Sequence, residues 1–194
     1  MGVTALIAPY WSIIDDYFWE FYVNYLGRER AFHHQYPQKS FLAHGVNLAF
    51  HSDFSVVAPD SLRALYSAVT RRIPRRIFER HYGRNPAYRY VDDADTDLAY
   101  GDMGALPPEE ERLDLEEALQ AYTLGGAYAN FLEKDLNSVA VGKLADLVIL
   151  DRNLYEIPFE DLPQARVVMT LFEGSIVFED DGTLPKGVRP PLPE

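Results

Sequence analysis

Residues 45–60, GVNLAFHSDFSVVAPD, decide the fold class of this chain. The run over residues 46–50 is short and almost wholly apolar, which is typical of a strand covered on both faces in a parallel sheet. Polarity switches at its carboxyl end to His51, Ser52 and Asp53, and this end of a strand is where α/β sheets and barrels build active sites. Asp53 is therefore the first candidate site residue, although an aspartate here can also cap the following helix or turn.

The flanking segments complete an α/β pattern. Residues 3–8 form a short aliphatic run, and residues 29–43 have a helical pattern interrupted by Pro37. With the strand at residues 45–50 they predict a strand–helix–strand unit, whose two strands should be parallel. Apolar positions at helical spacing then predict a second helix after Asp60: Leu62, Leu65, Tyr66 and Val69.

The rest of the chain changes in character. Pro74 should end or kink the second helix, and the long segment from Gly83 to Pro108 is rich in Gly, Pro, Asp and Tyr, which marks a functional loop or an insertion. A further helix is predicted over residues 113–122. The last third has short apolar runs separated by turn residues, which predicts antiparallel strands: residues 139–141, 147–150, 167–171 and 176–178.

An aromatic segment follows the first strand and contains Tyr10, Trp11, Tyr17, Phe18 and Trp19. It is predicted to form a helix or a lid. Core packing is the commoner reason for such crowding, and lining of a substrate pocket is the alternative. If the segment lines a pocket, it favours an apolar or aromatic substrate.

Composition excludes several classes of protein. The 194 residues are 47% hydrophobic, which is enough for a packed core. The chain has no cysteine, so disulfides and thiolate metal sites are excluded. No apolar run approaches the roughly 18 residues of a membrane span, and the first residues lack the features of a signal peptide. We expect a soluble cytoplasmic protein that does not bind membranes.

The formal net charge of -12 is unevenly distributed. Residues 1–90 hold 11 Lys and Arg against 7 Asp and Glu, whereas residues 91–194 hold 7 against 23. Seven arginines fall between Arg71 and Arg89, which could indicate a nucleic-acid surface. The acidic segment from Asp92 onward offers a nearer counter-charge, so we predict ion pairing within the chain and no nucleic-acid partner.

Five stretches in a fixed order resemble a known family: GVNLAFHSDFSV, ALYSAVTRR, LDLEEALQAYTLGGAYA, VGKLADLVILDRNLYEIP and EGSIVFE. They are similar to the closing part of the amidohydrolase superfamily, family 3, in the branch with N-substituted formamide deformylases and exoenzyme regulatory proteins. GKLADLVILD is the most specific of these signals. The resemblance covers nearly the whole chain apart from residues 76–105 and the proline-rich tail.

The resemblance implies the last two βα units of a (βα)8 TIM-type barrel, followed by C-terminal strands of a small β-sandwich. Residues 3–8 would be barrel strand seven and residues 45–50 strand eight. The implied division is residues 1–138 for the barrel part, 139–180 for the sandwich strands, and 181–194 for an extended tail.

The same resemblance implies a role for Asp53, and their positions in the chain suggest roles for two further residues. Asp53 falls where the family places its strand-eight aspartate, which binds or faces the metal and moves a proton from metal-activated water to the leaving group. His51 is expected to line a polar pocket and contact substrate. If both lay in one strand they would share a face, so His51 is also a conceivable second metal ligand. Arg30, in the connection between the two strands, could reach an anionic substrate group, or could pair with Glu29 or a helix end.

The family's other metal ligands are a His-x-His pair on the first strand, a lysine or glutamate on the fourth, and histidines on the fifth and sixth. None of these strands is present, and one carboxylate cannot hold a catalytic zinc. The adjacent His33 and His34 point in different directions on a helix, which disfavours a site made from that pair.

These observations define two main hypotheses, and a self-sufficient small domain with its own new fold is a third possibility. The first is the C-terminal portion of a metal-dependent amidohydrolase that cleaves a non-peptide C–N bond of a small molecule. The complete enzyme would use a divalent metal, zinc, whereas this chain alone would be inactive, bind no metal, and associate with a missing N-terminal barrel half or with itself. The alternative is a non-catalytic interaction or regulatory module derived from the same fold, so whether the chain is an enzyme stays open.

Overall fold

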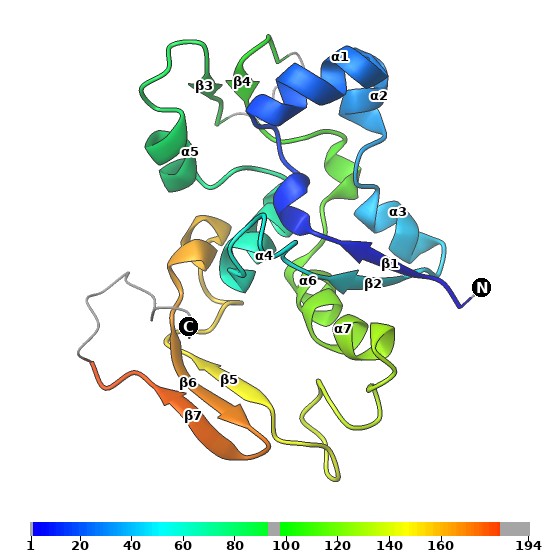
Figure 1. Ribbon diagram of the computed structural model, residues 1–194, viewed down its shortest axis with the longest axis vertical. Coiled ribbons are helices and arrows are strands. Elements are labelled where there is room, and N and C mark those ends of the chain that lie inside the picture. Colours follow the sequence, from blue (N-terminus) through cyan, green and yellow to red (C-terminus); the bar gives the residue numbers. More distant parts are fainter. Residues whose placement is uncertain (1, 93–97, 183–194) are drawn as a thin grey trace.

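The candidate site lies at the carboxyl ends of two short parallel strands (Figure 1). The computed structural model describes residues 2–92 and 98–182. Strand β1 (Thr4–Ile7) pairs in parallel with β2 (Asn47–Phe50), with Thr4 opposite Asn47 and Ile7 opposite Phe50. The predicted parallel strand–helix–strand unit is therefore confirmed.

The connection between these strands consists of short helical pieces separated by turns. Its elements are η1 (Pro9–Trp11), η2 (Phe18–Tyr22), α1 (Val23–Leu26), α2 (Arg28–His33) and α3 (Gln38–Ala43). Asp15 starts the second piece, because its Oδ1 accepts the Phe18 backbone N–H at 2.8 Å. Gly27 ends α1 at φ 78°, a conformation that glycine adopts readily. Pro37 separates α2 from α3, as its position in the helical pattern predicted.

Helix α4 (Ser61–Thr70) follows β2, and the Asp60 carboxylate caps it by accepting the Arg63 backbone N–H at 3.1 Å. The helix ends at Thr70, four residues before Pro74, because Arg71 turns into the left-handed conformation at φ 54°. The buried Arg71 guanidinium then donates to main-chain carbonyls of other segments. Pro74 precedes a new helix, α5 (Arg75–His81), so the prediction that it ends or kinks the earlier one was wrong.

The segment before residue 108 is folded against the aromatic segment. It contains β3 (Arg89–Tyr90) and β4 (Asp102–Met103), which pair in parallel. Leu98, Met103 and Leu106 are buried in one core cluster with residues of the aromatic segment. Trp19 Nε1 donates to the Asp102 carbonyl at 3.0 Å. The segment therefore builds a second core, and its residues 93–97 lie outside the described part of the chain.

The counter-charge predicted for the arginine-rich stretch is confirmed at two positions. Arg75 pairs with Asp92, and Arg89 pairs with Asp102 at 2.9 Å. These ion pairs explain why a row of arginines lies next to a row of aspartates.

Three helical elements follow. They are η3 (Glu109–Glu111), α6 (Leu115–Tyr122) and α7 (Leu124–Ala129). Asp114 and Glu117 form a capping box, which sets the start of α6 two residues after the predicted one. Gly125 lets α7 cross β2 closely, because a Cβ there would lie 1.9 Å from the Leu48 carbonyl oxygen.

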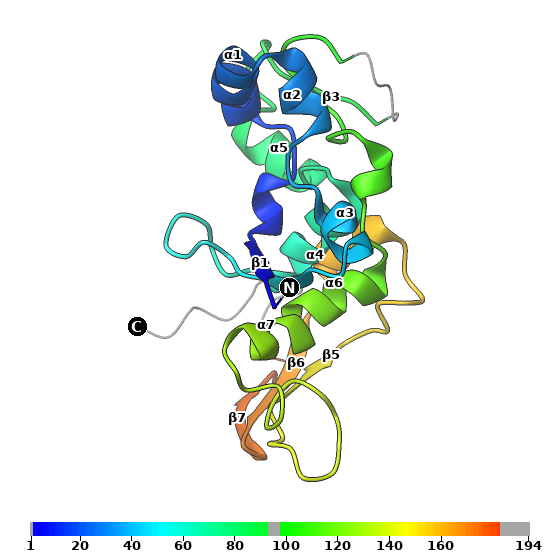
Figure 2. The same ribbon diagram turned by 90° about the vertical axis from the view of Figure 1, so that its right-hand side faces the viewer.

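The last third forms an antiparallel sheet in the order β5-β6-β7, as predicted (Figure 2). The strands are β5 (Leu147–Leu150), β6 (Val167–Phe172) and β7 (Ser175–Glu179), with η4 (Phe159–Gln164) before β6. The strand predicted at residues 139–141 was wrong: Val139 is 90% exposed, and no strand among the described residues pairs with this run.

These elements confirm the α/β class. The described residues supply no second sheet against β5-β6-β7, so the sandwich stays a prediction, as do the barrel assignment and the division into residues 1–138, 139–180 and 181–194. Within residues 2–92 and 98–182, no helix has both the length and the apolar character needed to cross a membrane. Most of the predicted tail lies outside the described residues.

Candidate active site at the ends of the parallel strands

Asp53 lies in the turn that follows β2. Its backbone is left-handed at φ 58°, and its carbonyl oxygen accepts the Val56 N–H at 2.8 Å. The carboxylate oxygen Oδ2 accepts the indole N–H of Trp11 at 3.3 Å. The side chain therefore does not cap α4, a role that Asp60 fills, and it reaches instead toward the end of the neighbouring strand.

Trp11 comes from η1, directly after β1. Because β1 and β2 are parallel, their carboxyl ends lie at one edge, and the groups that follow each strand meet there. Trp11 belongs to the aromatic segment, for which lining of a substrate pocket was the alternative to core packing, and it does line the pocket that contains Asp53. Its hydrogen bond to Asp53 was not predicted. Its position after a strand that pairs with β2 was the signal that could have identified it.

His51 is the first residue after β2, and its ring turns back toward Asp53. The ring nitrogen Nδ1 accepts the Asp53 backbone N–H at 3.0 Å. An accepting Nδ1 carries no proton, so the neutral ring carries its proton on Nε2. The expectation that His51 and Asp53 share one strand face was wrong, because the strand ends at Phe50 and a turn follows.

A pocket of about 310 Å³ brings these three side chains together. Its remaining wall is apolar or aromatic and comes from β1 and from the start of α3: Leu6, Ile7, Ala8, Tyr36, Pro37 and Phe41. One carboxylate and one imidazole thus face a largely apolar surface, which is a common arrangement in small-molecule sites.

Tyr36 supplies a phenol to this wall and holds its proton firmly. Burial, followed by the hydrogen bond to Tyr22, raises the pKa of Tyr36 well above its ordinary range. The two hydroxyl oxygens are 3.2 Å apart. The Tyr36 backbone, left-handed at φ 51°, is held by Arg71, whose Nη1 donates to its carbonyl at 2.9 Å. Burial lowers the pKa of Arg71 to about 10, so its guanidinium stays charged at neutral pH.

Asp15 is a titratable group that the sequence pattern did not identify. Burial, with a smaller contribution from the neighbouring Asp16, raises the pKa of Asp15 to about 6. Its hydrogen bond from Phe18 opposes that shift without cancelling it. Asp15 does not line the pocket, so its effect is on the stability of the aromatic segment.

The metal-binding capacity of the described residues is low. No three His, Cys, Asp or Glu side chains gather among residues 2–92 and 98–182 in a way that could hold a metal ion. A catalytic zinc needs about three protein ligands. Asp53 and His51 therefore do not complete such a site by themselves.

Arg30 lies on the exposed surface of α2, and it is not among the residues that line the Asp53 pocket. Its role as a substrate-binding residue stays a prediction, as do the roles of Asp53 and His51.

Comparison with known proteins places this chain in a family. Residues 9–178 match the family model described as the amidohydrolase family. The chain belongs to the amidohydrolase family. The matched residues include both Trp11 and Asp53, and the family predicted from the five sequence stretches is thereby confirmed.

Individual relatives agree with this assignment. The chain is 31% identical over 153 residues to Protein LONG AFTER FAR-RED 3 of Arabidopsis thaliana, across 79% of this chain and 21% of that protein. It is 30% identical over 89 residues to the N-substituted formamide deformylase of Arthrobacter pascens, across 45% of this chain and 16% of that enzyme. The chain therefore spans about a fifth of the length of these relatives.

A solved structure agrees at the level of the fold. The guanine deaminase of E. coli superposes on 92% of this chain and 34% of its own, with a TM-score of 0.50 and 16% sequence identity. This amidohydrolase family member thus shares its α/β architecture with part of a larger protein.

Proposed function

We propose that this chain forms the C-terminal portion of a metal-dependent hydrolase that cleaves a non-peptide C–N bond of a small molecule. One observation carries the proposal: in a chain of the amidohydrolase family, the Asp53 carboxylate and the Trp11 indole N–H meet where two parallel strands end. Paired polar groups at that edge are typical of α/β active sites.

The fit of a metal to this chain is incomplete. A divalent ion such as zinc would supply an activated water when bound. The residues described here offer Asp53, with His51 nearby, and the remaining ligands would come from the part of the protein outside this chain.

Asp53 is the group that would move a proton. The Trp11 indole N–H engages Oδ2 and orients the carboxylate, so that Oδ1 remains to accept a proton from an attacking water and return it to the leaving nitrogen. His51 lines the same pocket, and its Nε2–H would donate to a substrate oxygen. The apolar wall would exclude bulk water and receive an apolar substituent of the substrate.

The isolated chain should be inactive. Leu6 of β1 is 64% exposed, and Val3, which directly precedes β1, is 54% exposed. Both residues are apolar, and β1 should be interior in a closed barrel. The remaining barrel strands would cover this edge. Without them, we expect the chain to associate with itself.

The test is a comparison of variants in the complete reading frame. Asp53→Asn should retain metal by elemental analysis and lower kcat by about 100-fold or more, the usual range for loss of a general acid–base group. The matched control is Asp135→Asn, which neutralises an exposed aspartate far from the pocket in sequence and should leave turnover unchanged. Normal turnover by Asp53→Asn with bound metal would remove the proposed role.

A non-catalytic interaction module is the second candidate. The lack of three gathered metal ligands among residues 2–92 and 98–182 favours it. Affinity purification of the complete protein under native conditions separates the two: a stoichiometric partner without metal or hydrolysis supports the module, whereas bound metal with hydrolysis supports the enzyme.

A further inference from the structure

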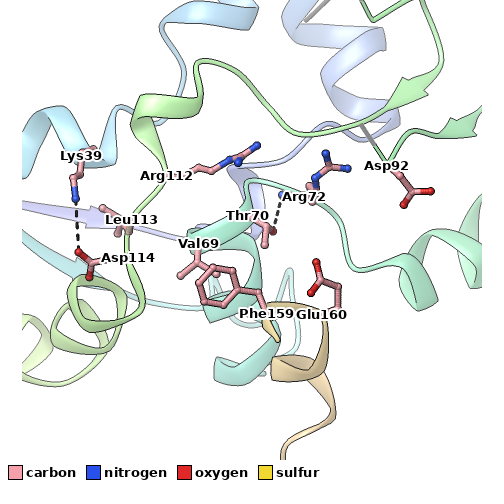
Figure 3. Close-up of a pocket in the computed structure, with 10 residues that line it drawn as sticks. All are labelled: Lys39, Val69, Thr70, Arg72, Asp92, Arg112, Leu113, Asp114, Phe159 and Glu160. Carbon is pink, nitrogen blue, oxygen red and sulfur yellow. Dashed lines mark hydrogen bonds and ion pairs between the residues drawn. The ribbon is translucent and has the colours of Figure 1, made fainter. Parts of the chain in front are cut away.

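A second pocket, of about 640 Å³, lies away from Asp53 (Figure 3). Helix α4 begins beside η1, where the Tyr10 hydroxyl donates to the Asp60 carbonyl at 3.4 Å. The second pocket lies at the other end of this helix, at Val69 and Thr70. The start of α6 and the start of η4 complete its wall. It shares no lining residue with the Asp53 pocket.

Two guanidinium groups form the positive side of this pocket. In Figure 3, Arg72 and Arg112 lie above Val69 and Phe159. Arg72 Nη1 donates to the Val91 carbonyl at 2.6 Å, and Arg112 Nη1 pairs with Glu109 at 2.5 Å. Arg112 Nε is buried and has no hydrogen-bond partner among the described residues. This buried Nε is out of reach of a pocket ligand, but the outer guanidinium nitrogens of Arg72 and Arg112, two residues that line the pocket, are suited to charge-assisted hydrogen bonds with a ligand carboxylate.

Among the other charged residues that line the pocket, one carboxylate remains to pair with a positively charged group of a ligand. Lys39 is held by Glu117 at 2.5 Å and lies 3.9 Å from Asp114. Asp92 is paired with Arg75. Glu160 has no ion pair among the residues that the structure describes, and Figure 3 shows its carboxylate below the two guanidinium groups. The pocket thus has a positive side and a negative side.

The floor between these sides is apolar. Val69 and Leu113 are each 3% exposed, and the ring of Phe159 is 42% exposed and forms part of the lining. Glu160 would repel a simple anion, and Arg72 and Arg112 would repel a simple cation. A ligand that carries both charges therefore fits this pocket better than either ion.

We propose that this pocket binds a small zwitterion with an apolar side group, of the α-amino-acid type. Its carboxylate lies against Arg72 and Arg112, its ammonium lies toward Glu160, and its side group covers Phe159. This inference is independent of the proposed hydrolysis, because it uses none of the residues of the Asp53 pocket.

Three probes that share one phenyl group test the charge requirement. The 194-residue chain labelled with ¹⁵N would be titrated with L-phenylalanine, with 3-phenylpropanoate, which lacks the ammonium, and with 2-phenylethylamine, which lacks the carboxylate. We expect the amide signals of Val69, Thr70 and Leu113 to shift with L-phenylalanine, and affinity to fall roughly tenfold for each probe that lacks a charge. The Trp11 indole signal should not move.

Equal affinity for the three probes, shifts confined to Trp11, or no shift with L-phenylalanine would each overturn the proposal.

Two variants assign each charge to its side of the pocket. Glu160→Gln should weaken L-phenylalanine roughly tenfold and leave 3-phenylpropanoate unchanged or stronger. Arg112→Gln should weaken both. The matched control Arg76→Gln removes an exposed arginine of α5 outside the pocket and should change neither affinity. A Glu160→Gln chain that binds L-phenylalanine as the wild type does would exclude the assigned orientation.

Discussion

The strand β2 and the sheet β5-β6-β7 contain similar apolar residues in opposite environments. Leu48 and Ala49 of β2 are 3% and 1% exposed, whereas Val148 of β5 and Ile176 of β7 are 58% and 56% exposed. The helices α3, α6 and α7 contact β2, but the C-terminal sheet has no second layer among the described residues (Figures 1 and 2). Burial of an apolar strand in this chain therefore depends on which helices cover it.

The largest expected effect is loss of a side chain from the covered region. Leu65 of α4 is 3% exposed and lies in the core cluster that contains β2. Leu65→Ala should lower the free energy of unfolding by about 3 kcal/mol, through lost burial and a residual cavity. Ile176→Ala in β7 removes a side chain of equal size and should cost less than about 1 kcal/mol. Urea denaturation of both variants measures the difference, and equal losses would contradict the comparison.

A smaller effect is expected where α7 crosses β2. Gly125→Ala would place a methyl group 1.9 Å from the Leu48 carbonyl oxygen, so the helix must move away from the strand. We expect a loss of about 2 kcal/mol. Gly126→Ala is the matched control in the same helix, because a Cβ there meets nothing within 4 Å. It should be neutral or stabilising by up to about 1 kcal/mol, since alanine favours helix. The ratio of the urea denaturation midpoints of the two variants tests the close approach of α7 to β2.

Asp15 offers a pH-dependent test of the covered region. Burial raises its pKa from the ordinary value of 3.8 to about 6, so the folded chain keeps this proton at a pH where the unfolded chain has lost it. Stability from this group is therefore present below about pH 4 and is lost as pH rises toward 6.

Asp15→Asn removes this titration while its amide oxygen can still accept the Phe18 N–H. The variant should gain about 2 kcal/mol relative to the wild type between pH 4 and pH 7. Urea denaturation at both pH values measures the gain, with Asp135→Asn as an exposed control. A pH-independent difference would show that Asp15 is not the group that titrates.

The smallest effect on stability is expected at the exposed sheet. Val177 lies in the edge strand β7 and is 59% exposed. Val177→Lys should change the free energy of unfolding by less than about 0.5 kcal/mol but reduce self-association, because a lysine on an edge strand opposes pairing between chains. Sedimentation velocity measures association. Unchanged association would locate it elsewhere, with the exposed β1 edge as the next region to test.

The candidate site was predictable in part. Asp53 and His51 could be identified because both follow a recognisable apolar strand, and the structure places them in one pocket. Trp11 was missed as a partner, because its hydrogen bond joins residues 42 positions apart. The predicted geometry of His51 and Asp53 was wrong for a local reason: the strand ends at Phe50, three residues before Asp53, and Asp53 adopts a left-handed turn.

The sequence by itself determined the α/β pattern, the parallel pairing of residues 3–8 with 45–50, and membership of the amidohydrolase family. These features depend on periodicity and on local signals such as the Asp60 and Asp114 caps, which are carried by neighbouring residues. The tertiary structure alone decided that apolar residues of the C-terminal strands are exposed and which side chains meet at the two pockets. Those outcomes depend on contacts between distant segments, which no local pattern specifies.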